Sequence, residues 1–105
     1  MPYSHLTLAC EGSTAIITLN RPAQRNALSL ALMHEMIECL GELERDGQVR
    51  SIILAAAGPA FCAGHDLREM TGLDAKAYAE VFSLCTAMMT KVQSVPQPVL
   101  SLIHI

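Results

Sequence analysis

Hydrophobic and polar positions follow one another in patterns that divide this chain into strands and helices. Two short runs, residues 5–10 and 14–19, are strand-like and flank the turn residues 11–13, so they predict an opening β-hairpin. The run over 49–57 is apolar and rich in β-branched residues, which predicts a parallel strand buried on both of its faces. A similar apolar run begins at Val99 and predicts the last strand.

Two longer stretches show the spacing of amphipathic helices. The first begins after Ser29, a favourable N-cap residue, and ends near Asp46. Its apolar stripe comprises Leu30, Met33, Met36, Ile37, Leu40 and Leu43. The second runs from about Asp74 to Val92, ahead of two prolines. Its expected buried positions are Tyr78, Val81, Phe82, Cys85, Met88 and Met89. Strands that alternate with helices predict right-handed βαβ crossovers, a mostly parallel sheet and therefore an α/β fold class.

The stretch between the third strand and the second long helix combines a glycine turn with a helix-start signal. Residues 59–70 read PAFCAGHDLREM. Asp66 is a favourable N-cap residue and Glu69 follows three positions later, so a capping box predicts a helix that starts at about Leu67. The first N–H groups of a helix lack internal partners and lie at the positive end of its dipole, so they favour a negatively charged oxygen. Gly64 would let the chain turn sharply and expose the N–H of the next residue.

A second motif occurs earlier in the chain. Residues 19–29 read LNRPAQRNALS, which resembles the N-R-P-x-x-x-N-A-L signature of the crotonase (enoyl-CoA hydratase/isomerase) superfamily, and 63–67 (AGHDL) resembles that family's second motif. The similarity runs from about Leu6 to His104. It implies a partial ClpP/crotonase-like fold, with residues 1–105 as the N-terminal part of a single domain. Because family members are much longer, we expect a fragment that is truncated before the sheet is complete.

The resemblance also implies a site and a reaction. The backbone N–H of His65 would be the first of two donors to the oxygen of an acyl-CoA thioester, and would stabilise an enolate during hydration or isomerisation of a 2-enoyl-CoA. The implied substrate-binding residues are Ala23, Gln24, Arg25, Ala63, Gly64, His65, Asp66, Leu67 and Arg68. No metal and no cofactor beyond the coenzyme A of the substrate is implied. The second donor and the proton-transfer carboxylates would lie beyond Ile105, and the full-length protein would be a homotrimer or hexamer.

Several of these residues have simpler interpretations, which the sequence leaves open. The imidazole of His65 could act directly as an acid or base, or be an exposed turn side chain. Asp66 and Glu69 could form an acid–base pair, although their spacing fits helix capping better. Arg25 could be a solvated surface charge. Cys62 and His65 could both bind a metal ion, although two ligands do not make a zinc site. For the chain as a whole, the alternatives are a non-catalytic acyl-CoA-binding or interaction protein and a truncated product without activity.

Composition narrows the possible partners and the cellular setting. The chain has 105 residues and a net charge of −3 without a basic face, which argues against nucleic-acid binding. Arg21, Arg25 and Arg68 nevertheless lie in the motifs, where their charge would suit a phosphorylated ligand. The four cysteines show no framework spacing and the N-terminus has no secretory pattern, so we expect a reducing, cytoplasmic setting. No apolar run reaches the length of a membrane span.

Overall fold

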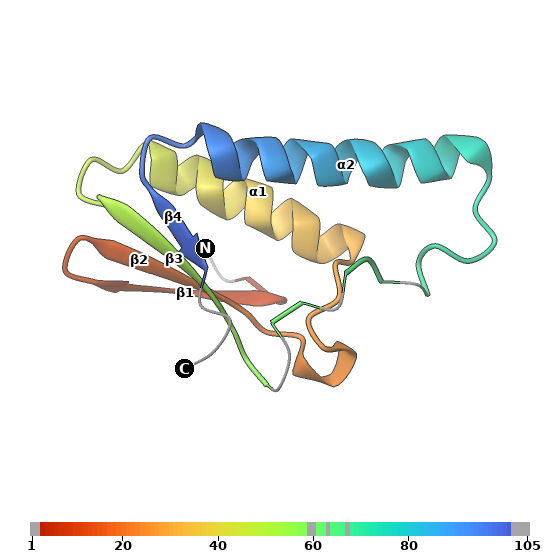
Figure 1. Ribbon diagram of the computed structural model, residues 1–105, viewed down its shortest axis with the longest axis horizontal. Helices are drawn as coiled ribbons and strands as arrows, with labels where there is room; N and C mark the ends of the chain where they lie inside the picture. The colour runs from red at the N-terminus through yellow and green to blue at the C-terminus, as the bar shows by residue number, and fades with distance from the viewer. Residues whose placement is uncertain (1–2, 59–60, 63, 67, 102–105) are drawn as a thin grey trace.

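The part of the chain that the structure describes forms a four-stranded sheet with two long helices on it (Figure 1). A computed structural model describes residues 3–58, 61–62, 64–66 and 68–101. The strands are β1 (Leu6–Glu11), β2 (Thr14–Leu19), β3 (Ser51–Ala56) and β4 (Val99–Ser101). The helices are α1 (Leu30–Glu44) and α2 (Ala75–Ser94), and Pro22–Gln24 form a 3₁₀ turn, η1. The opening hairpin and the order of elements confirm the α/β fold class.

The strands follow sequence order across the sheet. β1 pairs with β2 in the antiparallel sense, from Leu6 opposite Leu19 to Glu11 opposite Thr14. The β2–β3 and β3–β4 pairs are parallel, with α1 and α2 as their crossovers, and both helices lie on the same face of the sheet (Figure 1). Because these strands run the same way, the carboxyl ends of β2, β3 and β4 share one edge of the sheet.

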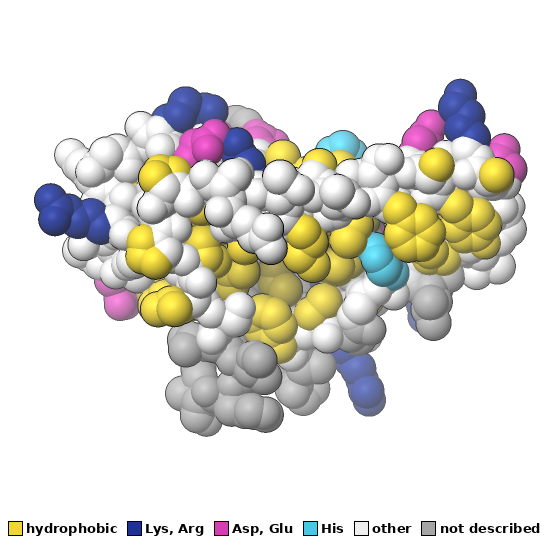
Figure 2. All heavy atoms as spheres, turned by 45° about the horizontal axis from the view of Figure 1, so that its top comes forward, with side chains coloured by type: hydrophobic (Ala, Val, Ile, Leu, Met, Phe, Trp, Pro, Cys, Tyr) yellow, Lys and Arg dark blue, Asp and Glu magenta, His cyan; other side chains and the backbone are white. Residues whose placement is uncertain are grey.

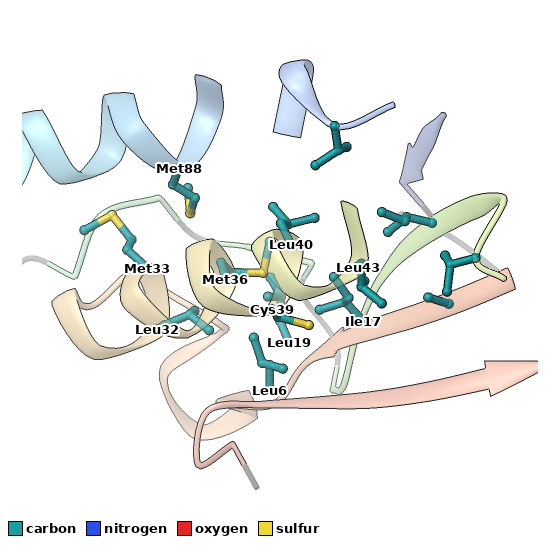
Figure 3. Packing of buried hydrophobic residues seen from close by; sticks show 14 of the residues in the cluster. Leu6, Ile17, Leu19, Leu32, Met33, Met36, Cys39, Leu40, Leu43 and Met88 are labelled. Carbon is teal, nitrogen blue, oxygen red and sulfur yellow. The ribbon is translucent and has the colours of Figure 1, made fainter. Parts of the chain in front are cut away.

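The core lies between α1 and the sheet, as Figure 3 shows. Four members of the predicted apolar stripe of α1 are buried because they recur at helical spacing on one face, whereas Leu30, at the start of the helix, is exposed and Ile37 is partly buried. The four are Met33, Met36, Leu40 and Leu43. The labelled residues of this core are Leu6, Ile17, Leu19, Leu32, Met33, Met36, Cys39, Leu40, Leu43 and Met88. Removal of these side chains from water is the main favourable contribution to folding.

Both long helices begin where the sequence predicts: Ser29 is the N-cap of α1, as expected, and α2 starts after Asp74, which proves to be its N-cap. The Ser29 side chain accepts a hydrogen bond from the Leu32 N–H at 3.1 Å, and the Asp74 carboxylate accepts one from the Ala77 N–H at 2.8 Å. Each cap satisfies a backbone donor that the first turn of a helix cannot pair internally. These caps fix where α1 and α2 start, and so also the lengths of the connections that precede them.

Other sequence-based expectations are wrong. Leu67 lies outside the described residues, and residues 68–72 form turns, so no helix follows Asp66 there. Phe82 and Met89, expected to be buried, are each 51% exposed. Within β3 only Ile52 is buried, which does not fit a strand covered on both faces. β3 is exposed because both helices lie on one face of the sheet, and no described element covers the other face (Figure 1).

Candidate functional site

Two segments meet at the edge of the sheet formed by the carboxyl ends of the parallel strands. Residues 20–28, which we call the first motif segment, follow β2, and the described residues between 57 and 70, which we call the second motif segment, follow β3. They are joined by a parallel bridge between Leu28 and His65. The Leu28 N–H donates to the Gly64 carbonyl at 2.7 Å, and the Asp66 N–H donates to the Leu28 carbonyl at 2.9 Å. The edge outside the carboxyl ends of such strands is where α/β proteins commonly bind ligands.

The bridge fixes the direction of the His65 backbone. Successive N–H groups of an extended chain point to opposite sides, and the Asp66 N–H points at Leu28. The N–H of His65 therefore points away from Leu28, and no described residue accepts a hydrogen bond from it. Gly64, at φ +91, adopts a conformation that side chains disfavour and that turns the chain into this position.

The imidazole of His65 is held against α2. Its ring packs edge-on to Phe82, with centroids 5.7 Å apart and an interplanar angle of 78°. The Nδ1 atom is buried and has no hydrogen-bond partner among the described residues. The side chain is partly buried, so the interpretation of His65 as a fully exposed turn residue does not fit this structure.

An ion pair between the motif segments is the feature that the sequence did not reveal. A terminal guanidinium nitrogen of Arg21 lies 3.1 Å from an Asp66 carboxylate oxygen, and the two side chains are only 13% and 10% exposed. The hydrogen bond from Arg21 holds the pKa of Asp66 below its ordinary value, helped by the backbone N–H of Arg68 and opposed by desolvation. The positive charge of Arg21, which the sequence suggested for a phosphorylated ligand, is therefore already paired.

Asn26 completes this arrangement from within the first motif segment. It is fully buried, and its side-chain carbonyl accepts a hydrogen bond from the Arg21 N–H at 2.7 Å. Its side-chain amide donates to the Ala57 carbonyl at 2.8 Å, which ties the first motif segment to the end of β3. The signal available in sequence was the N-R-P-x-x-x-N spacing, which names both residues without showing that they touch.

Glu69 does not form the capping box that the sequence suggested. Its carboxylate accepts a hydrogen bond from the Leu30 N–H at 2.7 Å, so it caps α1 instead of a helix after Asp66. Asp66 accepts from the Arg68 N–H at 3.0 Å through its other carboxylate oxygen. Both carboxylates therefore have structural partners, which argues against the acid–base pair left open by the sequence.

The remaining predicted binding residues divide by exposure. Ala23 and Gln24 lie in η1 and are exposed, as is Arg25, which follows them. All three precede Leu28, the residue that bridges to His65, by a few positions. Arg68 is also exposed, on the turn after Asp66. Ala63 and Leu67 lie outside the described residues. The guanidinium groups of Arg25 and Arg68, unlike that of Arg21, form no ion pair with a described residue, so they can meet an anionic ligand.

An apolar cavity of about 300 Å³ lies behind the second motif segment. Its lining residues are Leu19, Leu28, Met36, Leu54, Phe61, Cys62, Met88, Met89, Val92 and Ser101. Figure 2 shows hydrophobic side chains gathered in a hollow beneath α2, with charged side chains toward the ends of the molecule. Cys62 faces this cavity, and no group of three or more potential metal ligands occurs among the described residues.

The fold and site together define an α/β protein with a backbone N–H, at the carboxyl edge of its sheet, that no described residue accepts. The sequence pattern of the enoyl-CoA hydratase/isomerase family matches residues 9–104, and the chain belongs to that family. Over 90 residues it is 38% identical to enoyl-CoA hydratase domain-containing protein 3, mitochondrial, of Rattus norvegicus, covering 84% of this chain and 30% of that protein.

Solved structures agree with this assignment. The crystal structure of enoyl-CoA hydratase from Mycobacterium smegmatis superposes with a TM-score of 0.93 at 41% identity, covering 96% of this chain and 40% of that one. The enoyl-CoA hydratase from Bacillus anthracis gives a TM-score of 0.92 at 34% identity, covering 95% and 40%. The chain thus spans well under half the length of the relatives that it matches.

The cytoplasmic location of this chain stays a prediction. The name of the rat protein places that relative in mitochondria, whereas the sequence of this chain suggested the cytoplasm. Within the described ranges, no helix combines the length and apolar character needed to cross a membrane.

Proposed function

We propose that this chain contributes part of an acyl-CoA site, in which the His65 N–H binds the thioester oxygen. The observation that carries the proposal is the direction of this N–H, away from Leu28 and without an acceptor among the described residues. A preorganised N–H donor stabilises an oxyanion strongly because its alignment costs nothing when charge develops. Stabilisation of the negative charge that develops on the thioester oxygen lowers the barrier to forming an enolate.

In this proposal the rest of the ligand lies across both motif segments. The exposed guanidinium groups of Arg25 and Arg68 would meet phosphates of coenzyme A, with Ala23 and Gln24 in the same groove. The apolar cavity behind Cys62 has room for part of an acyl chain. Coenzyme A enters as part of the substrate, and no separate cofactor is needed.

The reaction would be hydration of a 2-enoyl-CoA or isomerisation of its double bond, in fatty acid metabolism. Since Asp66 and Glu69 are engaged in structural hydrogen bonds, we assign the proton-transfer groups and the second oxyanion donor to residues outside this chain. The same proposal includes assembly as a homotrimer or hexamer. A family-length protein that bound acyl-CoA without turning it over would instead be the non-catalytic binder.

The test uses a family-length protein, meaning this chain joined to the matching C-terminal part of the M. smegmatis hydratase. His65→Pro removes the N–H, whereas His65→Ala keeps it, so we expect proline to lower kcat for crotonyl-CoA by about 100-fold or more and alanine by far less. Circular dichroism checks that both variants fold. If alanine proves as damaging as proline, the imidazole carries the chemistry and the backbone role is wrong.

A further inference from the structure

We propose that Arg21 and Asp66 are positioning residues, whose ion pair fixes the direction of the His65 N–H. The carboxylate involved belongs to the residue that follows His65 directly, and it lies 3.1 Å from the guanidinium. The proposal rests on the proposed function, because it concerns the same donor. Neither residue would touch the substrate.

Arg21 is held in place from several sides. One terminal nitrogen donates to the Ala27 carbonyl while the other contacts Asp66, so the guanidinium spans the first motif segment and the second. The backbone N–H of Arg21 donates to the Asn26 side chain at 2.7 Å. A planar guanidinium can serve two acceptors in fixed directions, which the single ammonium of lysine does poorly.

Asp66 is fixed at both ends as well. One carboxylate oxygen accepts from Arg21, the other accepts from the Arg68 N–H at 3.0 Å, and its backbone N–H donates to the Leu28 carbonyl at 2.9 Å. With both oxygens occupied, the carboxylate serves geometry and not proton transfer. Its constraint acts one residue from the donor, where a small rotation of the peptide changes the direction of the N–H.

The ion pair adds a side-chain constraint to a turn that is otherwise held by backbone hydrogen bonds and by the contact of the His65 ring with Phe82. Residues 64–66 belong to neither a helix nor a strand, and Gly64 adds freedom at φ +91. Without the pair, the two backbone hydrogen bonds to Leu28 would be the remaining hydrogen bonds that join this turn to the first motif segment among the described residues. Since the pair is largely excluded from water, its attraction is less screened than that of a surface pair.

The experiment measures kinetics of the family-length protein with Arg21→Lys, Asp66→Asn and the double variant. We expect each single variant to lower kcat for crotonyl-CoA about 10-fold to 100-fold with little change in KM, because a displacement of about 1 Å has effects of this size. The double variant should be no worse than either single one, since both break the same interaction. The matched control is Lys91→Met, which breaks the ion pair between Lys91 and Glu44 on the helices and should lower thermal stability without lowering kcat.

A second measurement separates this proposal from the proposed function. In protein labelled with ¹⁵N-histidine, the NMR order parameter of the His65 amide should fall in Asp66→Asn and stay unchanged in Lys91→Met. An active parent whose folded variants keep full kcat would overturn the positioning role and leave the proposed function intact. A parent without turnover would overturn the proposed function, and an unchanged order parameter would then overturn the positioning role too. Should Asp66→Asn fail to fold, Arg21→Lys carries both measurements.

Discussion

At the scale of single residues, the arginines of the two motif segments differ in what their charges can do. Arg21 is paired with Asp66 and nearly buried, so it contributes little positive potential to a ligand. Arg25 and Arg68 are exposed, and both lie near the bridge that presents the His65 N–H. The sequence could place all three in motifs, but only the structure assigns one to the interior.

We predict that Arg25→Gln and Arg68→Gln each raise KM for an acyl-CoA about 2-fold to 10-fold and leave kcat nearly unchanged, because phosphate contacts contribute equally before and during the reaction. The salt dependence of KM should weaken in both variants. The control is Arg50→Gln, which removes an exposed charge beside the opposite edge of the sheet, just before β3 begins. Steady-state kinetics at several salt concentrations provide the test, and an unchanged KM in both motif variants would make these arginines ordinary surface charges.

The pKa of Asp66 leads to a prediction about acid stability. The Arg21 hydrogen bond lowers this pKa from its ordinary value of 3.8, so the folded state favours the ionised carboxylate. The resulting stabilisation is complete above the pKa of the unfolded chain and is lost as pH falls through the lower pKa of the folded state. We therefore expect the difference in unfolding free energy between the parent and Asp66→Asn to shrink as pH falls below about 4. Urea unfolding of the family-length protein across that range measures it, and a constant difference would contradict the assigned pKa shift.

At the scale of elements, the connection from β2 to α1 is built around one buried asparagine. Arg25 and Asn26 both adopt left-handed backbone conformations, at φ 52 and 56, which non-glycine residues seldom adopt. Asparagine tolerates this region better than most side chains. The turn directs Asn26 inward, where it pairs with the Arg21 N–H and the Ala57 carbonyl.

We predict that Asn26→Ala destabilises the family-length protein by about 2–4 kcal/mol. The reason is that the Arg21 N–H and the Ala57 carbonyl each lose the hydrogen bond that the Asn26 side chain makes with them. The matched control is Asn20→Ala, since Asn20 is exposed and donates its backbone N–H to the carbonyl of His5, just before β1, a hydrogen bond that alanine retains. Its effect should stay within about 0.5 kcal/mol. Chemical denaturation measures both values, and equal effects at the two positions would refute the structural role of Asn26.

The elements that sequence predicted well are those set by local periodicity. The hairpin, α1, β3 and α2 follow from hydrophobic spacing and from the caps at Ser29 and Asp74. The helix expected after Asp66 failed because a capping box is a local pattern, whereas Glu69 finds its partner on α1, 39 residues earlier.

The same distinction holds for the candidate site. The sequence identified His65 and both motif segments, since each is a contiguous pattern. It did not identify the ion pair of Arg21 with Asp66, whose members are 45 residues apart and become neighbours only when β2 and β3 align in parallel. The burial expected for Phe82 and Met89 also failed, because helical spacing shows which face is apolar and not what covers it.

At the scale of the whole molecule, apolar surface is left open on several elements. In the described part of the chain, the exposed large hydrophobic residues are Leu8, Leu30, Phe82, Met89 and Leu100, with Leu100 on β4 at 61%. β1 and β4 are the edges of the described sheet, and unpaired edges favour association with other chains. The solved relatives are longer, since this chain covers only 40% of the M. smegmatis hydratase. A small core stabilises the folded chain only weakly, and the exposed apolar surface favours aggregation.

We therefore predict that the isolated 105-residue chain is aggregated or molten and inert toward crotonyl-CoA. We expect no turnover because the proposed site would have one oxyanion donor, the His65 N–H, where it needs two. The carboxylates of Asp66 and Glu69 are also engaged in structural hydrogen bonds and so are not available for proton transfer. Gel filtration, a thermal melt and a hydratase assay test these points directly.

Thiol labelling reports on the core during the same experiment. In the folded structure Cys39 is fully buried and burial raises its pKa to about 11, so its thiol is both hidden and protonated, whereas Cys10 is exposed. In a molten chain, we expect Cys39 to react with a thiol reagent nearly as fast as Cys10. The matched comparison is the family-length protein, in which Cys39 should be protected because the core between α1 and the sheet is stably packed. A monomer that melts cooperatively, protects Cys39 and hydrates crotonyl-CoA would show that these 105 residues contain a complete fold and a complete site.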